Sequence, residues 1–381
     1  MSTSHSTTSR NPTPPPSGPS HAGPAHLSSG HPSPAPSGPA RPAIMADVAK
    51  LAGVSHQTVS RVLNGHPSVR PDTRARVLQA VTELSYRPNG LARGLAQRRS
   101  RVLGVVSFDT ILFGPASTLL GIERAARTAG YGISIVALER VDRTGVLNAV
   151  NALAGQAVDG VVIIAPQMSA AAALHSLPPG MPAVAVEAGI DGAIPAVAVD
   201  QVAGARLAVE HLLNLGHSTV WHIAGPNDWL EARDRTEGWR SMLEEAGRRV
   251  PPTITGDWSA RSGFSAGAAL AGRPDVTAIF AANDQMALGL LRALHERGVR
   301  VPEEISVVGF DDIPEAEFLL PPLTTIRQDF DEVGRRSMAL LLALIDSNDG
   351  GSGPWAPTAR VEPTLILRRS TAPPPPDQAA T

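Results

Sequence analysis

Residues 47–65, DVAKLAGVSHQTVSRVLNG, combine polar side chains that can bond to base edges with the spacing of two short helices. Four polar residues fall on the outward face of the second helix: His56, Gln57, Ser60 and Arg61. When such a helix enters the major groove, its N-terminal turns meet the base edges. The chemistry that this pattern favours is therefore recognition of DNA by a helix-turn-helix.

Apolar spacing and two short residues define the helices that carry these side chains. The residues expected to face inward are Ala46, Val48, Ala49, Leu51 and Ala52 in the first helix and Val59, Val62 and Leu63 in the second. Gly53 permits the sharp turn between them, because glycine adopts left-handed backbone angles without a Cβ clash. Ser55 is expected to cap the second helix, since its side-chain oxygen can accept from free N–H groups.

A third helix is predicted from about Pro71 to Leu84. Proline suits the first helical position, because it has no N–H to leave unsatisfied. Val77, Val81 and Leu84 follow one another at i, i+4 and i+7, which places them on one face. Tyr86 is expected to close the small core that the three helices share.

The composition is that of a globular protein without membrane or disulfide chemistry. The chain has 381 residues, too many for one core, so two or three domains are expected. No apolar run is long enough to cross a bilayer, and the first 43 residues hold no apolar segment typical of a secretory signal. Cysteine is absent, which excludes disulfides and thiolate metal sites. We therefore expect a soluble protein of the reducing cytoplasm with no membrane partner.

Positive charge is concentrated around the helix-turn-helix. Residues 45–101 carry a net charge of +7, whereas the whole chain carries −2, so the larger remainder is acidic. A small basic module joined to an acidic body indicates that only the module contacts phosphate.

Five segments are predicted along the chain. Residues 1–43 and 371–381 are rich in proline and small polar residues and are expected to be disordered. Residues 44–87 form the helix-turn-helix domain, and residues 88–100 form a linker whose two glycines disfavour an isolated helix. Residues 101–370 form the main body. Four histidines in the first segment are spaced too irregularly to favour a metal site: His5, His21, His26 and His31.

From Val102 onward, apolar strands alternate with amphipathic helices. The predicted strands are 102–107, 132–138, 160–165, 182–186, 197–199, 219–224, 277–281 and 305–309. The predicted helices are 118–129, 146–154, 202–215, 234–246, 262–271, 284–297 and 331–346. Near-continuous apolar strands separated by helices favour parallel sheets covered on both faces. The number of strands favours two α/β lobes over a single sheet.

Four groups of motifs resemble the lac repressor (LacI/GalR) family over nearly all of residues 44–370. They are DVAKLAGVSHQTVSRVLNG with TRARV and YRPNGLARGLA, VEHLLNLGHSTVWHIAGP with RDRTEGWRSML, FAANDQMALGLLRAL, and ISVVGFDDIPEAEFLLPPLTTIRQDF. The resemblance implies an all-α helix-turn-helix headpiece and a hinge helix within 88–100. It also implies an α/β core of two doubly wound parallel-sheet lobes, similar to periplasmic sugar-binding proteins. The implied lobes are discontinuous, pairing 101–199 with 328–355 and 200–327 with 356–370.

The resemblance also assigns DNA contacts. It gives the base-reading role to His56, Gln57 and Arg61, and an arginine can donate two hydrogen bonds to guanine. The residues expected to contact phosphate or cap the helix are Ser55, Thr58, Ser60 and Asn64. The hinge contacts are Asn89, Ala92 and Leu95. Leu95 stands where the family inserts a leucine into the minor groove.

Sugar recognition needs polar groups that bond hydroxyls and an aromatic face for the apolar side of the ring. By resemblance, Arg235, Asn283 and Asp311 match positions that hold sugar hydroxyls, and Trp258 matches a ring-stacking tryptophan. Four more residues match cleft positions: Asp109, Glu187, Gln328 and Phe330. Of these, Glu187 replaces an aspartate and Asp109 replaces a small hydroxyl residue of a relative, which leaves the sugar open.

Two structural alternatives stand beside this reading of the cleft. Arg235 and Asp311 could form an ion pair between the lobes, and Trp258 could be core packing. The Trp258 match favours a β-galactoside-like inducer or a related disaccharide.

These observations favour a homodimeric repressor of sugar-utilisation genes that binds a pseudo-palindromic operator in double-stranded DNA. A small sugar effector is expected to release it. The alternatives are an activator, or a regulator that uses a non-sugar effector or a corepressor. An enzyme on a related α/β scaffold is the remote alternative. The sequence contains no GxSxG, GxxxxGK[ST] or GxGxxG after a strand, and no metal-ligand spacing, so we expect no catalysis, cofactor or metal.

Overall fold

The computed structural model describes residues 41, 43–86, 99–108, 111–138, 143–174, 177, 180–187, 194–347 and 359–376. The chain divides into two units, Met1–Pro88 and Asn89–Thr381. Several predictions lie outside the described residues: most of the 1–43 tail, the hinge helix with Asn89, Ala92 and Leu95, the cleft residue Asp109, and residues 377–381. Among the described residues, no helix is long and apolar enough to cross a membrane.

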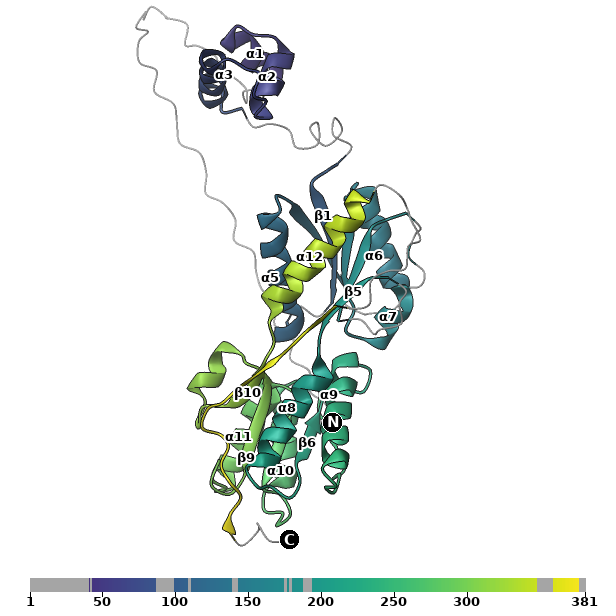
Figure 1. Cartoon of the computed structure of the whole chain (residues 1–381), viewed down its shortest axis with the longest axis vertical. Helices are drawn as coiled ribbons and strands as arrows, with labels where there is room; N and C mark the ends of the chain where they lie inside the picture. Colours follow the sequence, from purple (N-terminus) through teal and green to yellow (C-terminus); the bar gives the residue numbers. More distant parts are fainter. Residues whose placement is uncertain are drawn as a thin grey trace, which may run out of the picture. The chain divides into compact units, whose positions relative to one another are not determined.

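The first unit is a three-helix domain built around a small apolar core (Figure 1). Its helices are α1 (Met45–Ala52), α2 (His56–Leu63) and α3 (Pro71–Glu83). The buried residues are Val48, Ala52, Val59, Val62, Val77, Ala80 and Tyr86. Gly53 ends α1 with φ of 63°, as the turn requires. Two inward predictions are wrong: Ala46 and Leu51 are exposed, because only one narrow face of so short a helix contacts its neighbours.

The second unit contains two lobes, each with one six-stranded sheet. In the first lobe the strand order is β11-β5-β4-β3-β1-β2, and every neighbouring pair is parallel. The strands are β1 (Val102–Phe108), β2 (Gly132–Leu138), β3 (Val161–Ile164), β4 (Ala183–Val186), β5 (Ala196–Val199) and β11 (Ala359–Val361). Helices α5 (Phe113–Thr128) and α12 (Phe330–Asp346) share one apolar core with the sheet. Helices α6 (Arg143–Gly155) and α7 (Met168–Leu174) share another.

The second lobe repeats this plan with the strand order β12-β10-β9-β8-β6-β7. The strands are β6 (Trp221–Ala224), β7 (Ile254–Thr255), β8 (Ala278–Ala281), β9 (Ser306–Asp311), β10 (Thr324–Arg327) and β12 (Thr364–Ile366). Helices α8 (Gln201–Asn214) and α9 (Leu230–Glu245) belong to one core, and α10 (Ala260–Leu270) and α11 (Asp284–Glu296) to the other. A short 3₁₀ helix, η1 (Pro314–Phe318), follows β9. The edge strand β12 is antiparallel to β10.

The expected architecture of two doubly wound α/β lobes is therefore confirmed. Each predicted strand and helix exists, with ends shifted by a few residues. The sequence prediction missed α7 and the four strands β7, β10, β11 and β12, all short.

The chain passes between the lobes three times in the described residues. The crossings lie between β5 and α8, between β10 and α12, and between β11 and β12 (Figure 1). The first two agree with the predicted crossings near 199–200 and 327–328. The third lobe boundary, predicted at 355–356, is wrong, because Ala359–Val361 pairs with β5 of the first lobe. The crossing falls instead at Glu362 and Pro363, and it follows the burial of Val361 in the first lobe's core.

The end of the described chain is also more ordered than predicted. Residues 371–381 are expected to be disordered, yet Ala372 bonds to two buried side chains of the second lobe. Its N–H donates to Ser306 Oγ at 3.0 Å, and its carbonyl accepts from Ser306 Oγ at 2.9 Å and from His217 Nε2 at 3.0 Å. The prediction of disorder is therefore wrong for residues 371–376. The backbone of Ala372 satisfies the hydrogen-bonding groups of these buried side chains, and no apolar pattern in the sequence indicates such a contact.

Candidate effector pocket and DNA-binding helix

The outward face of α2 is polar and accessible. His56, Gln57 and Arg61 are exposed. Ser55 caps the helix as predicted, since its Oγ accepts from the Thr58 N–H at 3.2 Å. This arrangement leaves the side chains at the start of α2 free to meet a partner.

The remaining polar residues of α2 bond mainly to one another. Ser55 Oγ and Thr58 Oγ1 lie 2.9 Å apart, and Asn64 Nδ2 donates to Ser60 Oγ at 3.4 Å. Their side chains thus help to order the two ends of the helix.

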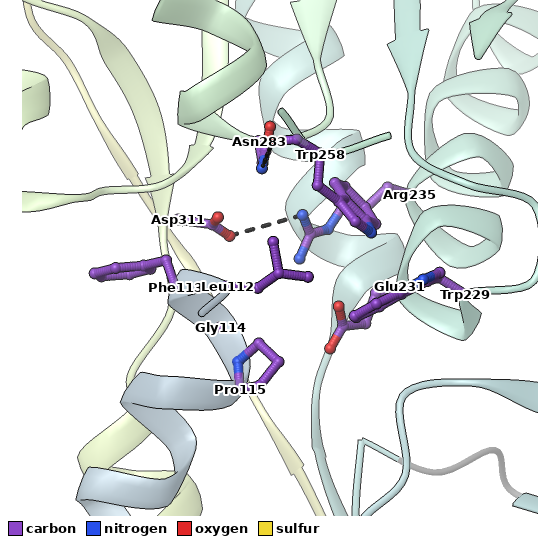
Figure 2. A pocket seen from close by; sticks show the side chains of 10 residues that line it. All are labelled: Leu112, Phe113, Gly114, Pro115, Trp229, Glu231, Arg235, Trp258, Asn283 and Asp311. Carbon is purple, nitrogen blue, oxygen red and sulfur yellow. Dashed lines mark hydrogen bonds and ion pairs between the residues drawn. The ribbon is translucent and has the colours of Figure 1, made fainter. Parts of the chain in front are cut away.

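A pocket lies where the start of α5 in the first lobe faces the carboxyl ends of the second lobe's strands (Figure 2). The empty space, including its opening to solvent, is ≈ 310 Å³. Its lining residues are Leu112, Phe113, Gly114, Pro115, Trp229, Glu231, Arg235, Trp258, Asn283 and Asp311. Ligands of open α/β sheets bind beyond the carboxyl ends of strands, so this is the expected place for an effector.

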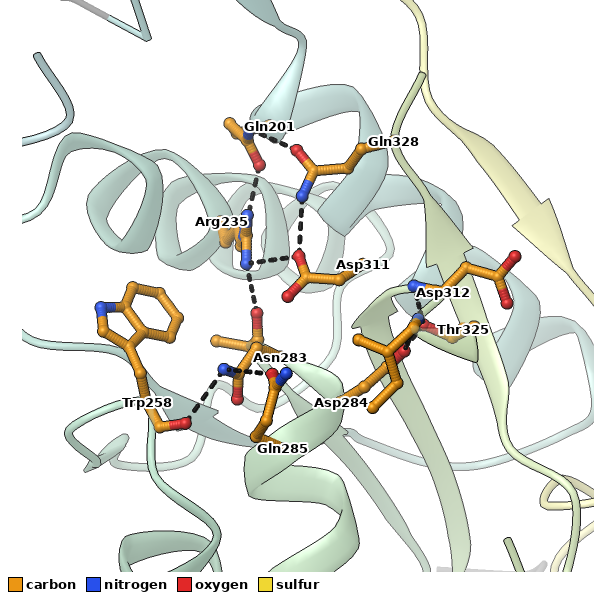
Figure 3. Close-up of polar contacts among 12 residues, drawn as sticks. Gln201, Arg235, Trp258, Asn283, Asp284, Gln285, Asp311, Asp312, Thr325 and Gln328 are labelled. Atoms are coloured by element: carbon orange, nitrogen blue, oxygen red, sulfur yellow. Dashed lines mark hydrogen bonds and ion pairs between the residues drawn. The ribbon is translucent and has the colours of Figure 1, made fainter. Parts of the chain in front are cut away.

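Arg235 is held rigidly at the base of this pocket. Its guanidinium carbon lies 3.8 Å from the centroid of the Phe310 ring, and only 2% of the residue is exposed. Nε donates to Gln201 Oε1 at 2.8 Å, and Nη1 donates to the carbonyl of Ala282 (Figure 3). Because these contacts fix the side chain, the remaining N–H groups point in set directions.

Asp311 faces Arg235 within the same lobe. Its Oδ1 lies 3.7 Å from Arg235 Nη1 and accepts from Gln328 Nε2 at 2.7 Å. Gln328 in turn accepts from Gln201 Nε2 at 2.9 Å, which closes a ring of four polar side chains (Figure 3). Arg235 and Asp311 therefore do form an ion pair. The pair lies within the second lobe and not between the lobes, because α9 and β9 both belong to the second lobe.

Asn283 has a structural role beside its place in the pocket. Its Oδ1 caps α11 by accepting from the Met286 N–H at 2.9 Å. Its two amide hydrogens go to the Trp258 carbonyl, at 3.1 Å, and to Gln285 Oε1, at 3.0 Å. Any direct bond to a ligand must therefore be made through Oδ1 as an acceptor.

Trp258 combines core packing with exposure to the pocket. It is only 5% exposed, and its ring fits against Gly225 so closely that a Cβ there would lie 2.2 Å from Cη2. Trp229 meets it edge-on, with ring centroids 5.6 Å apart and an interplanar angle of 76°. The Trp258 Nε1 is buried without a hydrogen-bond partner among the described residues. A buried donor without a partner points to a ligand acceptor in the pocket.

The carboxyl groups around the pocket are crowded. Burial raises the pKa of Asp311 to about 7, and Arg235 opposes this rise. Burial raises the pKa of Glu187 to about 8, with repulsion from Glu231 adding to it. The pKa of Glu231 is also raised by burial. Burial thus favours the protonated form of all three carboxyl groups, and the charge of Arg235 opposes it.

The structure brings four of the predicted effector residues into one pocket: Arg235, Trp258, Asn283 and Asp311. Gln328 supports Asp311 from behind. Glu187 is buried after β4, where its Oε1 accepts from the Val199 N–H at 3.3 Å. Phe330 packs edge-on against Phe113, with the two ring centroids 5.9 Å apart, and it borders a separate surface groove.

Six lining residues escaped the sequence prediction: Leu112, Phe113, Gly114, Pro115, Trp229 and Glu231. Glu231 precedes Arg235 by four residues, so helical spacing alone would place both on one face. Trp229 stands at the N-cap of α9. No polar pattern marks Leu112 to Pro115.

Sequence comparisons agree with this architecture. The family model of bacterial regulatory proteins of the lacI family matches residues 44–89, and that of a periplasmic binding protein-like domain matches residues 209–371. The lactose operon repressor of Escherichia coli K12 is 36% identical over 343 residues, covering 90% of this chain and 94% of the relative. The ribose operon repressor of the same strain is 33% identical, covering 79% and 92%. The repressor PurR of Haemophilus influenzae Rd is 32% identical, covering 86% and 98%.

Solved structures show the same likeness. A lac repressor dimer bound to operator and the anti-inducer ONPF superposes with a TM-score of 0.79 at 36% identity, covering 87% of this chain and all of that one. A complex of the regulator CelR with cellobiose gives a TM-score of 0.61 at 32% identity, covering 86% and 99%. These relatives are repressors rather than enzymes. The chain therefore belongs to the lacI family of bacterial regulatory proteins, and it is a DNA-binding transcriptional repressor with a separate ligand-binding core.

Proposed function

We propose that this repressor controls sugar-utilisation genes and that a small β-galactoside-like sugar in the pocket releases it from a palindromic operator. The convergence of Arg235, Asp311 and the unpartnered Trp258 Nε1 on one pocket carries this proposal. Donors and acceptors beside an aromatic ring suit a sugar, whose hydroxyls form paired hydrogen bonds while its C–H face stacks. The related regulator CelR, solved in complex with cellobiose, supports a sugar as the effector.

Titration of the full chain with a panel of monosaccharides and disaccharides tests the effector. Tryptophan fluorescence is a suitable signal, because Trp229 and Trp258 both line the pocket. We expect galactosides to shift the emission of the wild type, and Arg235→Ala to abolish the shift. The proposal fails if no sugar in the panel binds.

On the DNA side, we propose that His56, Gln57 and Arg61 read bases while Ser55, Thr58, Ser60 and Asn64 order the helix and contact phosphate. Arg61→Ala is expected to remove about 1–3 kcal/mol of discrimination at one operator base pair. Arg76→Ala on α3, also exposed, is the matched control, and any loss there should be equal for all sequences. Equal loss of discrimination in the two variants would contradict the assignment of Arg61.

For the hinge we propose that Asn89, Ala92 and Leu95 contact DNA and that Leu95 enters the minor groove, as the family pattern suggests. Leu95→Ala should then weaken operator binding strongly and leave sugar affinity unchanged, because the wedge acts only on DNA. Equal operator affinity of this variant and the wild type would defeat the proposal.

The mechanism we propose is linkage between two ligands. DNA favours the lobe arrangement that supports the hinge, and the sugar favours another, so each ligand weakens the other. Two half-sites one helical turn apart require two headpieces, which makes a homodimer the functional unit. We place this protein in the cytoplasm, where its operator and its sugar are both accessible.

A non-sugar effector or corepressor is the second candidate, and one observation favours it. The aromatic content of the chain is only 4%, which argues against a stacked base, but the pocket itself gathers Phe113, Trp229 and Trp258. Titration with purine bases alongside the sugars separates the two. Tighter operator binding in the presence of a base would identify a corepressor.

A further inference from the structure

The described lining of the pocket offers more hydrogen-bond acceptors than donors. Its acceptors are the carboxyl groups of Asp311 and Glu231 and the Oδ1 of Asn283, whose amide hydrogens are already used. Its free donors are the Nε1 of Trp258 and what remains of the Arg235 guanidinium. A ligand that complements this lining must donate more hydrogen bonds than it accepts.

The described lining also carries more acidic groups than basic groups. Among the described lining residues there are two carboxyl groups, those of Asp311 and Glu231, and one guanidinium, that of Arg235. The single cation, Arg235, is already committed to Gln201, the Ala282 carbonyl and Asp311. When both carboxyl groups are ionised, the described lining holds one cation for two anions, so a ligand cation would favour the ionised form of Glu231.

Glu231 is the carboxyl group left without a partner. No hydrogen bond or ion pair holds its carboxylate within the part of the chain that the structure describes, and the residue is half-buried at the pocket wall (Figure 2). Trp229 lines the same pocket, and its ring meets that of Trp258 edge-on. Tryptophan rings attract cations through their faces, so carboxylates and indoles together favour an ammonium group.

We propose that the effector carries a protonated amine, as an amino sugar does, and that Glu231 pairs with this amine beside Trp229 while a ligand oxygen accepts from Trp258 Nε1. This inference rests on the proposed sugar-binding function and narrows its ligand class. An ammonium supplies three donors and no acceptor, which matches the lining. A neutral galactoside would bring no charge to favour the ionised form of Glu231, whose pKa is raised by burial.

Calorimetric titration of the full chain with matched sugars tests the proposal. The probes are galactosamine and glucosamine, their neutral parents galactose and glucose, and their N-acetyl forms, which keep the nitrogen but lose the charge. We expect at least one amine to bind about tenfold more tightly than its parent and its acetylated form. Equal or weaker binding of the amines, with clear binding of the neutral sugars, would overturn this inference and leave the proposed function standing. No binding by any sugar would overturn both.

Glu231→Gln shows whether the preference for charge comes from this side chain. The variant keeps the size of the residue and one acceptor oxygen but removes the charge, so the affinity ratio of amine to acetylated sugar should fall to about one. Glu237→Gln is the control, because Glu237 is exposed on the same helix and lies outside the pocket lining. An unchanged ratio in Glu231→Gln would refute the proposed pairing, even if the amine binds well.

Discussion

Gln328 Nε2 donates a 2.7 Å hydrogen bond to Asp311 Oδ1, and this bond joins a lobe crossing to the effector pocket. Gln328 lies between β10 of the second lobe and α12 of the first, whereas Asp311 lines the pocket at the end of β9. A ligand that engages Asp311 therefore acts on a residue whose position depends on how the lobes are arranged. We propose that this pair couples ligand binding in the pocket to the arrangement of the lobes.

Replacement of Gln328 by leucine should lower effector affinity about tenfold or more, since a hydrogen bond to a charged group contributes about 1.5–3 kcal/mol. It should also reduce the effect of the ligand on operator binding, because the crossing residue no longer contacts Asp311. Calorimetry measures the first effect, and operator titration with and without ligand measures the second.

Gln156→Leu is the control for this substitution, because Gln156 is an exposed glutamine of the first lobe that bonds to Ser134. Equal ligand affinities in the two variants would show that Gln328 has no part in the pocket.

Gly225→Ala should disturb the pocket without touching a polar group. The added Cβ would lie 2.2 Å from Trp258 Cη2, so the ring must move. Overpacking of this kind costs about 1–3 kcal/mol of stability, and the displaced ring should weaken ligand binding. Gly155→Ala provides the comparison, because a Cβ at Gly155 meets nothing within 4 Å. If ligand affinity is unchanged in Gly225→Ala, Trp258 is core packing alone.

The stability of the ligand-binding core should fall as pH rises. The pKa of Glu187 is raised by burial from 4.5 to about 8, so the folded chain holds a proton that the unfolded chain releases. The free energy of unfolding must then decrease between pH about 4.5 and about 8. Glu187→Gln keeps an oxygen that can accept from the Val199 N–H and removes this titration, so its dependence on pH should be flatter. Denaturant unfolding across this range measures both slopes, and identical slopes would contradict the burial argument.

Truncation after Ser370 should lower the thermal midpoint of the core. It removes Ala372, which bonds to the buried side chains of Ser306 and His217. A buried polar group left without a partner costs about 1–3 kcal/mol. The pKa of His217 is lowered to about 4, mainly by burial, so the neutral ring donates through Nε2 to the Ala372 carbonyl at neutral pH. Truncation after Pro376 is the control, and equal midpoints for the two truncations would contradict the packing described.

The sequence predicted the parts of the fold whose signal is local. Long apolar strands such as β1 and amphipathic helices such as α11 stand out by periodicity alone. The short strands β11 and β12 do not, because their pairing depends on partners far along the chain, Ala359–Val361 with β5 and Thr364–Ile366 with β10. The third crossing was therefore misplaced by several residues.

Only those pocket residues that belong to a recognisable sequence motif could be predicted. Arg235, Asn283 and Asp311 lie on recognisable segments, and the structure gathers them. The use of both Asn283 amide hydrogens within the protein has no sequence signal, because it depends on the path of the Trp258 backbone. Nothing in the sequence singled out Glu231, and only the structure shows that it lines the pocket.

The central claim is that occupation of the pocket lowers affinity for DNA. The measurement is the affinity of the full chain for the palindrome beside its own gene, with and without the tightest-binding sugar of the panel. A coupling of about 3 kcal/mol predicts roughly 150-fold weaker operator binding when the pocket is filled, with Arg235→Ala insensitive to the sugar. Operator affinity that stays the same, or becomes tighter, with the pocket filled would contradict the account.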